Sequence, residues 1–314
     1  MWCWRRLNCD FAKILAVLLT VMVGSLPRVA QADPPLVMPI RSVDLAGVQE
    51  CYNDPHPGGF CDQCKSPNTG NYSLTNYVLL REALKAGGMD VKLVGIGSPN
   101  SARSRMMVET GMATIKADWD FNMDQNEHVL KSDAFIRSGE FFKGIYGLPE
   151  NPLLKNIHDI RDLRPLIAAT NLHWRLDWQV LQNMRLASLF PASTMSQMYN
   201  LIGQGRADFT LLEFSARPDM VRELNGLKLA PVADVKVALP GSQHFMVSRG
   251  DMRAERIIAV LNRGLKTLRE NGLLSQCLHQ GGVINAKAAD WKVLNAGEPG
   301  ISEHHTFDLL ENHR

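Results

Sequence analysis

The chain has 314 residues, of which 21% are charged, and a formal net charge of +2. The first 32 residues carry a net charge of +3, so the rest of the chain has a formal net charge of −1, and no later lysine and arginine run of the kind that follows nucleic-acid phosphates is present. This argues against nucleic acid as a partner class. The remaining chain is long enough to form one large domain or two lobes.

The N-terminal segment, residues 1–32, has the features of an export signal. Arg5, Arg6 and Lys13 precede an apolar run over 14–23, and the segment ends in the small-residue pattern Ala30-Gln31-Ala32. The alternative, a membrane anchor, is disfavoured because the run is about half of what a bilayer-spanning helix needs. We expect general secretion, cleavage after Ala32 and a periplasmic protein.

Downstream, amphipathic helices alternate with short apolar strands, which indicates an α/β protein. The spacing of apolar residues predicts a helix over 77–84 that ends at Gly87-Gly88, before a strand over 91–96. The second half repeats this unit with a helix over 195–202, a turn at Gly205 and a strand over 209–211.

The order of these elements resembles the extracellular solute-binding proteins of type II, family 3, whose best-known members serve amino-acid uptake. The resemblance covers roughly residues 43–284. It is carried by a series of motifs in the family's order: VETGMATIKADW (108–119), LKSDAFIRSGEFFKG (130–144), LIGQGRADFTLLE (201–213), VADVKVALPGSQHFMVSRGD (232–251) and RIIAVLNRGLKTLRENGLL (256–274).

The resemblance implies a two-lobed type II clamshell with a mixed sheet and flanking helices in each lobe. Lobe one is expected over 36–138 plus 236–287, lobe two over 139–235, and a C-terminal tail over 288–314 that packs on the outside. The implied function is capture of a small polar solute by a monomer, without cofactor or metal, for an ABC-type uptake system. A ligand-sensing component has the same architecture and is the first alternative.

Four segments are expected to meet at the cleft, because ligands of such folds lie at the carboxyl ends of strands and at helix N-termini. Phe60 follows a turn-rich segment and either covers a ligand or lies in an ordinary surface loop. Asp118 and Trp119 follow a lobe-one strand, where they clamp a polar ligand or form a solvated strand end. The third segment begins a lobe-two helix and contains Asn171, His173 and Arg175.

In this third segment Asn171 is expected to cap the helix, and Arg175 adds positive charge for an anion. Trp174 and Trp178, in contrast, share a helical face with Leu181 and are consistent with core packing.

Glu213, in the fourth segment, is the strongest candidate contact, because the resemblance implies an acidic residue here that receives a ligand's ammonium group. His244 borders the expected cleft and is either a ligand contact or structural. Glu213 or Asp118 would also serve an enzyme on the same fold, such as a periplasmic dehydratase. We expect binding without catalysis.

Two departures from the family weaken the inference of a free α-amino acid. The family's arginine after the first-lobe strand, which forks onto a ligand carboxylate, is missing from DFNMDQNEHVLKSD (120–133). The lobe-two anion loop is replaced by AATNLHWR (168–175). The ligand class is therefore left open, and another polar solute or a peptide fragment are the alternatives to a free α-amino acid.

The exported chain retains an even number of cysteines: Cys51, Cys61, Cys64 and Cys277. In an oxidising compartment we expect two disulfides, with three possible connectivities. The Cys61–Cys64 pair has redox spacing, but it lies in a loop between proline- and glycine-rich turns and does not open a helix. Two alternatives to structural disulfides remain: a redox-active cysteine pair in a thiol oxidoreductase, and metal binding together with His56.

Overall fold

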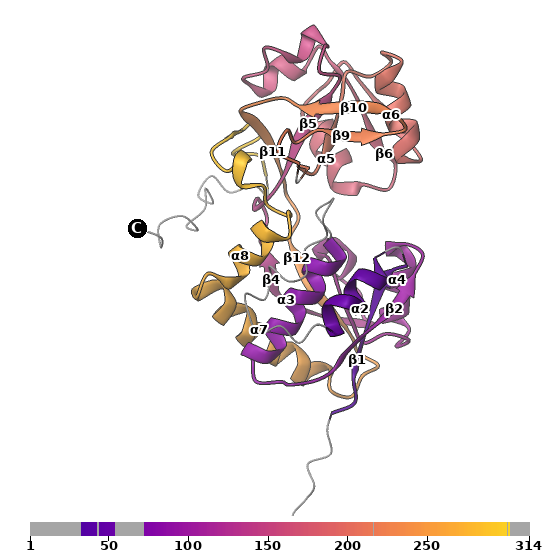
Figure 1. Ribbon diagram of the computed structural model, residues 1–314, viewed down its shortest axis with the longest axis vertical. Coiled ribbons are helices and arrows are strands. Elements are labelled where there is room, and N and C mark those ends of the chain that lie inside the picture. The colour runs from indigo at the N-terminus through magenta and orange to yellow at the C-terminus, as the bar shows by residue number, and fades with distance from the viewer. Residues whose placement is uncertain (1–32, 43, 54–71, 216, 300, 302–314) are drawn as a thin grey trace, which may run out of the picture. The chain divides into compact units, whose positions relative to one another are not determined.

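The computed structural model describes residues 33–42, 44–53, 72–215, 217–299 and 301. The described residues from Pro35 onward belong to one compact unit, in which the strands form the sheets of two lobes (Figure 1). From here on, lobe one means residues 36–136 and 243–280, and lobe two means residues 141–239 and 286–295. In the described part of the chain, no helix combines the length and hydrophobicity that crossing a membrane requires.

The elements of lobe one are β1 (Leu36–Arg41), α2 (Leu45–Asn53), α3 (Tyr72–Ala86), β2 (Leu93–Ser98), α4 (Ser101–Glu109), β3 (Ile115–Trp119), η1 (Asp120–Asn122), β4 (Val129–Ile136), β12 (Gln243–Ser248), α7 (Ala254–Glu270) and α8 (Leu273–Gln280). Those of lobe two are β5 (Phe141–Gly147), η2 (Pro152–Leu154), η3 (Ile160–Leu163), β6 (Ile167–Asn171), α5 (Arg175–Asn183), β7 (Ser188–Ala192), α6 (Met195–Gly203), β8 (Phe209–Leu212), β9 (Arg222–Leu224), β10 (Leu227–Pro231), β11 (Val235–Leu239), η4 (Ala286–Ala288) and β13 (Lys292–Val293).

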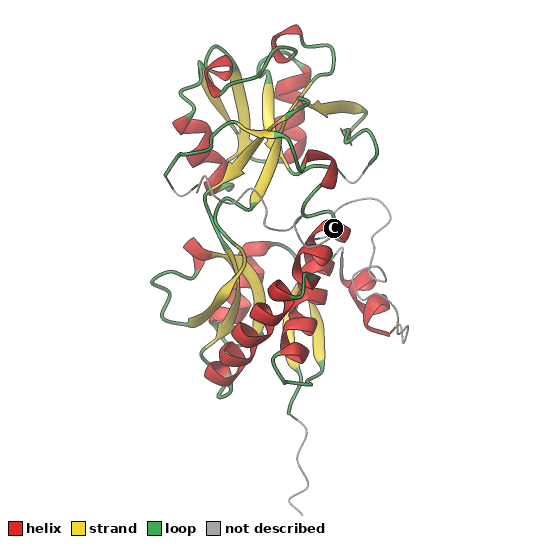
Figure 2. Cartoon of the chain, turned by 90° about the vertical axis from the view of Figure 1, so that its left-hand side faces the viewer, coloured by secondary structure: helices red, strands yellow, loops and turns green. Residues whose placement is uncertain are grey.

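The two lobes share one strand pattern. In lobe one, β2 pairs in parallel with β1, while β12 lies antiparallel between β3 and β4. A hydrogen bond of 2.8 Å from the Thr114 amide to the Val37 carbonyl places β1 beside β3. Lobe two repeats this order as β7-β6-β8-β5-β11, in which β5 is the antiparallel strand. Figure 2 shows the strands of each lobe with helices beside them. The expected α/β fold with a mixed sheet in each of two lobes is confirmed.

Helices α3 and α7 pack at unusually close range against each other in lobe one. A Cβ on Gly264 of α7 would lie 1.8 Å from the carbonyl oxygen of Ala83, and one on Gly87 would lie 2.0 Å from that of Val260. Only glycine lets two helix backbones approach this closely. As a result, the buried face of α7 packs into the core of lobe one through Ile257, Leu261, Leu265 and Leu268.

The chain passes between the lobes at two adjacent segments, 137–140 and 240–242. The Gly139 amide donates to the Leu239 carbonyl at 3.2 Å, and the Ser138 hydroxyl donates to the Pro240 carbonyl. Gly139 has a φ of 82°, a conformation that favours glycine. Residues 237–239 of β11 pair with β5, so the return passage follows Leu239, whereas the sequence places the lobe boundary at 236.

The segment after α8 forms a third connection, because it returns to lobe two. β13 pairs in parallel with β11, and the buried Asn295 side chain bonds both backbone groups of Ala238 at 2.9 Å. The buried Lys236 ammonium donates to the carbonyls of Ala288 and Ala289 at 2.7 and 2.6 Å. Residues 286–295 are thus part of the lobe-two sheet and its core, and not an external tail.

This anchor predicts a pH-dependent stability. Burial lowers the pKa of Lys236 to about 8, from 10.5 for an unperturbed lysine. Between these values the unfolded chain binds more protons than the folded chain, so the free energy of unfolding should rise with pH, by roughly 3 kcal/mol in total. When Lys236→Met is unfolded with urea at pH values from 8 to 10.5, its free energy of unfolding should not show this rise.

Lys228→Met is the matched control, since Lys228 is exposed on β10 of the same lobe. This variant should keep the full pH dependence. An identical slope in Lys236→Met and in the unsubstituted protein would contradict the assignment of the effect to Lys236.

Candidate functional site

A cavity of about 730 Å³ is lined by side chains of both lobes. Lobe one contributes the start of α4 and the end of β3 with the η1 turn, and lobe two contributes β5, the start of α5 and the residue after β8. The lining residues are Asn100, Ser101, Ala102, Arg105, Asp118, Trp119, Phe121, Asn122, Phe141, Lys143, His173, Trp174, Arg175, Leu176, Asp177, Glu213 and Leu239.

A buried charge cluster forms the lobe-two wall of this cavity. The Lys143 ammonium, on β5, lies 2.8 Å from a carboxylate oxygen of Asp177 on α5 and 3.5 Å from one of Glu213. It also lies 4.4 Å from the ring centroid of Trp174. The side chains of Lys143 and Asp177 are 4% and 5% exposed, whereas that of Glu213 is 33% exposed. Glu213 is therefore the member of the cluster that a solute can reach.

The charges of this cluster shift one another's pKa. For Lys143, burial favours the neutral form, but attraction to Asp177 and Glu213 outweighs it and the pKa is raised. Burial is the largest effect on Asp177 and raises the pKa of this carboxyl. For Glu213, burial is outweighed by Lys143 and Arg222, so its pKa is lowered. Glu213 consequently stays ionised at neutral pH, between the cations of Lys143 and Arg222.

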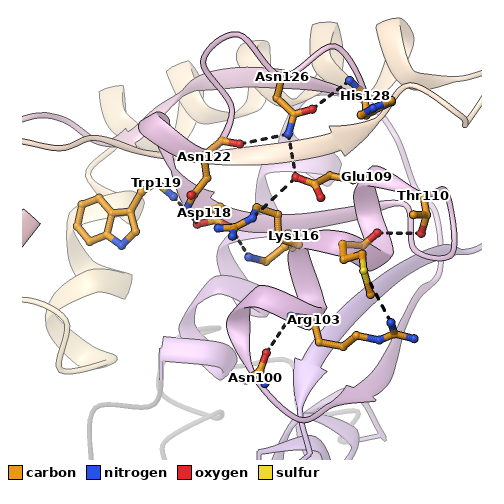
Figure 3. Close-up of polar contacts among 12 residues, drawn as sticks. Asn100, Arg103, Glu109, Thr110, Lys116, Asp118, Trp119, Asn122, Asn126 and His128 are labelled. Carbon is orange, nitrogen blue, oxygen red and sulfur yellow. Dashed lines mark hydrogen bonds and ion pairs between the residues drawn. The ribbon is translucent and has the colours of Figure 1, made fainter. Parts of the chain in front are cut away.

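A hydrogen-bond network orders the lobe-one wall (Figure 3). Asp118 is ion-paired with Lys116 and accepts hydrogen bonds from its neighbour's amide at 2.8 Å and from the Asn122 side chain at 2.9 Å. The Asn126 side chain donates to a Glu109 carboxylate oxygen at 2.8 Å and to the Asn122 carbonyl at 3.4 Å. Helix α4 is thus tied to the loop after β3.

Five of the sequence-predicted site residues line this cavity: Asp118, Trp119, His173, Arg175 and Glu213. They come from both lobes. The carboxylate of Asp118 is occupied by the partners described above, so we assign Asp118 the structural role of holding the loop after β3. Arg175 is exposed and its guanidinium carbon lies 4.9 Å from the ring centroid of Phe121 in lobe one.

Asn171 and His244 are not among the cavity-lining residues. The Asn171 side chain accepts from the His173 amide at 2.9 Å, and α5 starts later, with Trp174 at its N-cap position. Both ring nitrogens of the buried His244 are within hydrogen-bond distance of partners, Nδ1 of the Ser132 carbonyl at 2.7 Å and Nε2 of the Ser242 hydroxyl at 2.8 Å. Burial lowers the pKa of His244, which fits a neutral structural histidine.

Phe60 and His56 lie outside the described residues, as do the side chains of Cys51, Cys61 and Cys64. Cys277, on α8, is buried and disulfide-bonded. Which cysteine pairs with Cys277, and whether a second disulfide forms, stay predictions.

Lys143 and Asp177 are among the cavity-lining residues that sequence reasoning missed. Lys143 lies within the apolar stretch FFKGIYG of β5, and Asp177 is one turn from the predicted helix start. A charged residue inside a strand that is otherwise apolar was the available signal, since a buried lysine requires an acidic partner.

No protein-family model and no curated protein matches the chain. Among solved structures it is similar to substrate-binding domain 2 of Lactococcus lactis GlnP, with 15% identity, a TM-score of 0.46 and coverage of 66% of this chain and 84% of that one. It is also similar to the periplasmic VFT2 domain of Bordetella pertussis BvgS, with 16% identity, a TM-score of 0.47 and coverage of 78% and 92%.

An ancestral arginine-binding protein, solved with arginine bound, has 13% identity, a TM-score of 0.45 and coverage of 80% of this chain and 99% of that one. Similarity at this level does not identify a ligand. The function of this chain is inferred from its own cavity.

The buried ion pair predicts a large loss of stability on substitution of Lys143. Lys143→Met leaves the Asp177 carboxylate buried without a cation, which costs about 3–5 kcal/mol in other proteins. Lys143→Met/Asp177→Leu should recover most of the loss, because no buried charge of this pair remains. Urea unfolding of both variants measures the effect, and equal stability of Lys143→Met and the unsubstituted protein would contradict the assignment.

Proposed function

We propose that the chain is a periplasmic solute-binding protein that captures a small polar solute between its two lobes. The observation that carries the proposal is the cavity that both lobes line, with an ionised carboxylate of Glu213 at its wall. Concave sites with a few convergent polar groups are the usual form of small-molecule sites. Aromatic side chains of both lobes, Trp119 and Phe121 in one and Phe141 and Trp174 in the other, supply the apolar surface.

Glu213 is the proposed receptor for a cationic group of the solute. Lys143 lies between two carboxylates, and Glu213 is the exposed one of the two. A ligand ammonium beside Glu213 can donate a charge-assisted hydrogen bond to its partly exposed carboxylate.

Capture follows from contacts that span both lobes. A solute that contacts both lobes binds more tightly to the closed arrangement of the lobes than to the open one. Binding therefore shifts the population towards the closed arrangement. The hinge segments 137–140 and 240–242 are short and adjacent, as such a rotation requires.

Binding is favoured over catalysis by the state of the two candidate acids. Asp118 is used by Lys116, Asn122 and a backbone amide, and the pKa of Glu213 is lowered rather than raised. A general acid at neutral pH needs a raised pKa. The cavity therefore supports capture better than a dehydratase-like reaction.

The export signal over 1–32 supports a periplasmic location, and delivery of the solute to an ABC-type membrane transporter is the proposed role of a monomeric chain. A sensor component that presents the solute to a membrane partner is the alternative. A growth assay on the identified solute, with the gene deleted and then restored, separates uptake from sensing.

The proposed function is tested by substitution of Glu213. Glu213→Gln removes the charge and keeps the shape, so affinity for a cationic or zwitterionic solute should fall about 10- to 100-fold. Fluorescence of Trp119 and Trp174 during titration with a panel of amino acids and polyamines measures affinity. Glu223→Gln, on exposed β9, is the matched control and should bind as the unsubstituted protein does. Unchanged affinity in Glu213→Gln contradicts the proposed cation site.

A further inference from the structure

The third connection, residues 281–291, passes from lobe one to lobe two at Asn285. Before this point it is bonded to lobe one, because the amides of residues 283–284 donate to a carbonyl of α8 at 2.9 and 3.1 Å. The side-chain amide of Asn285 then donates to the Ser215 carbonyl of lobe two at 3.0 Å. Ser215 is two residues beyond Glu213, so the third connection reaches lobe two directly beside the proposed cation receptor.

The stretch 213–215 has left the lobe-two sheet, since β8 ends one residue earlier. Among the described residues, side chains take the place of strand partners for its backbone. The first carbonyl of the stretch accepts from Arg222 Nε at 2.6 Å, and its last amide donates to the Tyr146 hydroxyl at 3.2 Å. Its last carbonyl accepts from Asn285. The course of the backbone that carries Glu213 therefore depends on Asn285.

The Phe214 ring is packed between β5 and the third connection. A Cβ on Gly144 of β5 would lie 2.7 Å from this ring, and the Trp291 ring meets it edge-on, with the centroids 5.3 Å apart. Phe214 is buried and does not line the solute cavity, whereas Glu213 does. Successive side chains at a strand end point to opposite faces. A fixed Phe214 ring therefore sets the direction of the Glu213 side chain.

We propose that Asn285 and Trp291 are positioning residues for the Glu213 carboxylate. They act on it through Ser215 and Phe214, the two residues that follow Glu213. A hydrogen bond to a solute requires a donor–acceptor distance within a few tenths of an ångström of its optimum, so a displaced carboxylate binds a cation less well. This inference rests on the proposed function and deepens it, because it makes the chain beyond α8 part of the solute site.

Asn285 is anchored independently of its bond to Ser215. Its side-chain oxygen caps η4 by accepting from the Lys287 amide at 2.9 Å. The Lys287 ammonium donates to the Pro218 carbonyl at 2.7 Å, and the buried Lys236 bonds the two carbonyls described above. The capping oxygen and the donor of Asn285 therefore have separate roles, and a substitution can remove one and keep the other.

Asn285→Asp makes this separation. Aspartate keeps the capping oxygen, but it has no N–H donor and places an acidic oxygen against the Ser215 carbonyl. Affinity for the tightest-binding compound of the panel of amino acids and polyamines should fall about 10-fold. Asn271→Asp is the matched control in lobe one, because Asn271 likewise accepts from an amide two residues on, at 3.0 Å. This variant should bind within about twofold of the unsubstituted protein.

Trp291→Leu removes the aromatic contact with Phe214 and should also weaken binding of this compound. Trp291→Phe keeps an aromatic ring against Phe214 and should restore most of the affinity. Equal affinities of Trp291→Leu and the unsubstituted protein would contradict the part assigned to Trp291.

A double-mutant cycle distinguishes positioning from a general structural role. If Asn285 acts through the Glu213 carboxylate, Asn285→Asp should change affinity by less than about twofold once Glu213→Ala is present. A substitution that merely loosened lobe two would weaken binding equally in both backgrounds. Equal losses therefore overturn the inference and leave the proposed function intact.

Crystal structures of solute-free Asn285→Asp and Asn271→Asp test the inference without a solute. The Glu213 carboxylate should leave its place 3.5 Å from the Lys143 ammonium in Asn285→Asp and keep it in Asn271→Asp. An unmoved carboxylate in Asn285→Asp overturns the inference, whichever compound binds. If the carboxylate moves but Glu213→Gln binds every compound unchanged, the proposed cation site fails and the positioning of Glu213 by Asn285 is supported.

Discussion

The cavity depends on an exchange of strands between the lobes. β12, which completes the lobe-one sheet, reaches it only after the chain has built lobe two, and β5 enters the lobe-two sheet directly from lobe one. Each sheet is therefore covalently continuous with the other through the passages at 137–140 and 240–242. This places the ends of β3 and β8, and the starts of α4 and α5, around one volume, where ligands of open α/β sheets bind.

The charge arrangement of this volume follows from burial. Lys143 lies where water is largely excluded, and a lysine there is stable only beside carboxylates, which Asp177 and Glu213 supply. Asp177 is buried beside this lysine, whereas the carboxylate of Glu213 is partly exposed and faces the cavity. On the opposite wall the polar network around Asn126 fixes the loop after β3 without using Arg105 fully. Together these constraints leave a cavity with separated charges of both signs.

Much of the fold could be predicted from the sequence, because its hydrophobic periodicity is regular. The helices over 77–84 and 195–202 and the strand over 209–211 correspond to α3, α6 and β8. The predicted closing helix 256–274 is interrupted at Gly272, which has a φ of 79° and separates α7 from α8. The return of residues 286–295 to lobe two could not be predicted, since it depends on long-range contacts of Lys236 and Asn295 that leave no periodic signal.

The site was predictable only where a residue stands at the end of an element. Glu213 follows β8 and Arg175 begins α5, so their positions relative to the cleft follow from topology. His244, by contrast, lies within β12, where its side-chain direction depends on a β-bulge in the pairing with β4. Lys143 stands out as a charged residue in an apolar strand, but the sequence does not show that Asp177, 34 residues further on, is its partner.

The most direct test of a single solute site between the lobes is ¹⁹F NMR of the protein labelled with 5-fluorotryptophan, titrated with the panel compound of highest affinity. Trp119 belongs to lobe one and Trp174 to lobe two, and both line the cavity, whereas Trp291 lies elsewhere on lobe two. The resonances of Trp119 and Trp174 should move together with one dissociation constant, and that of Trp291 should stay in place. Movement of only one of the two cavity resonances, or of Trp291 alone, would contradict capture between the lobes.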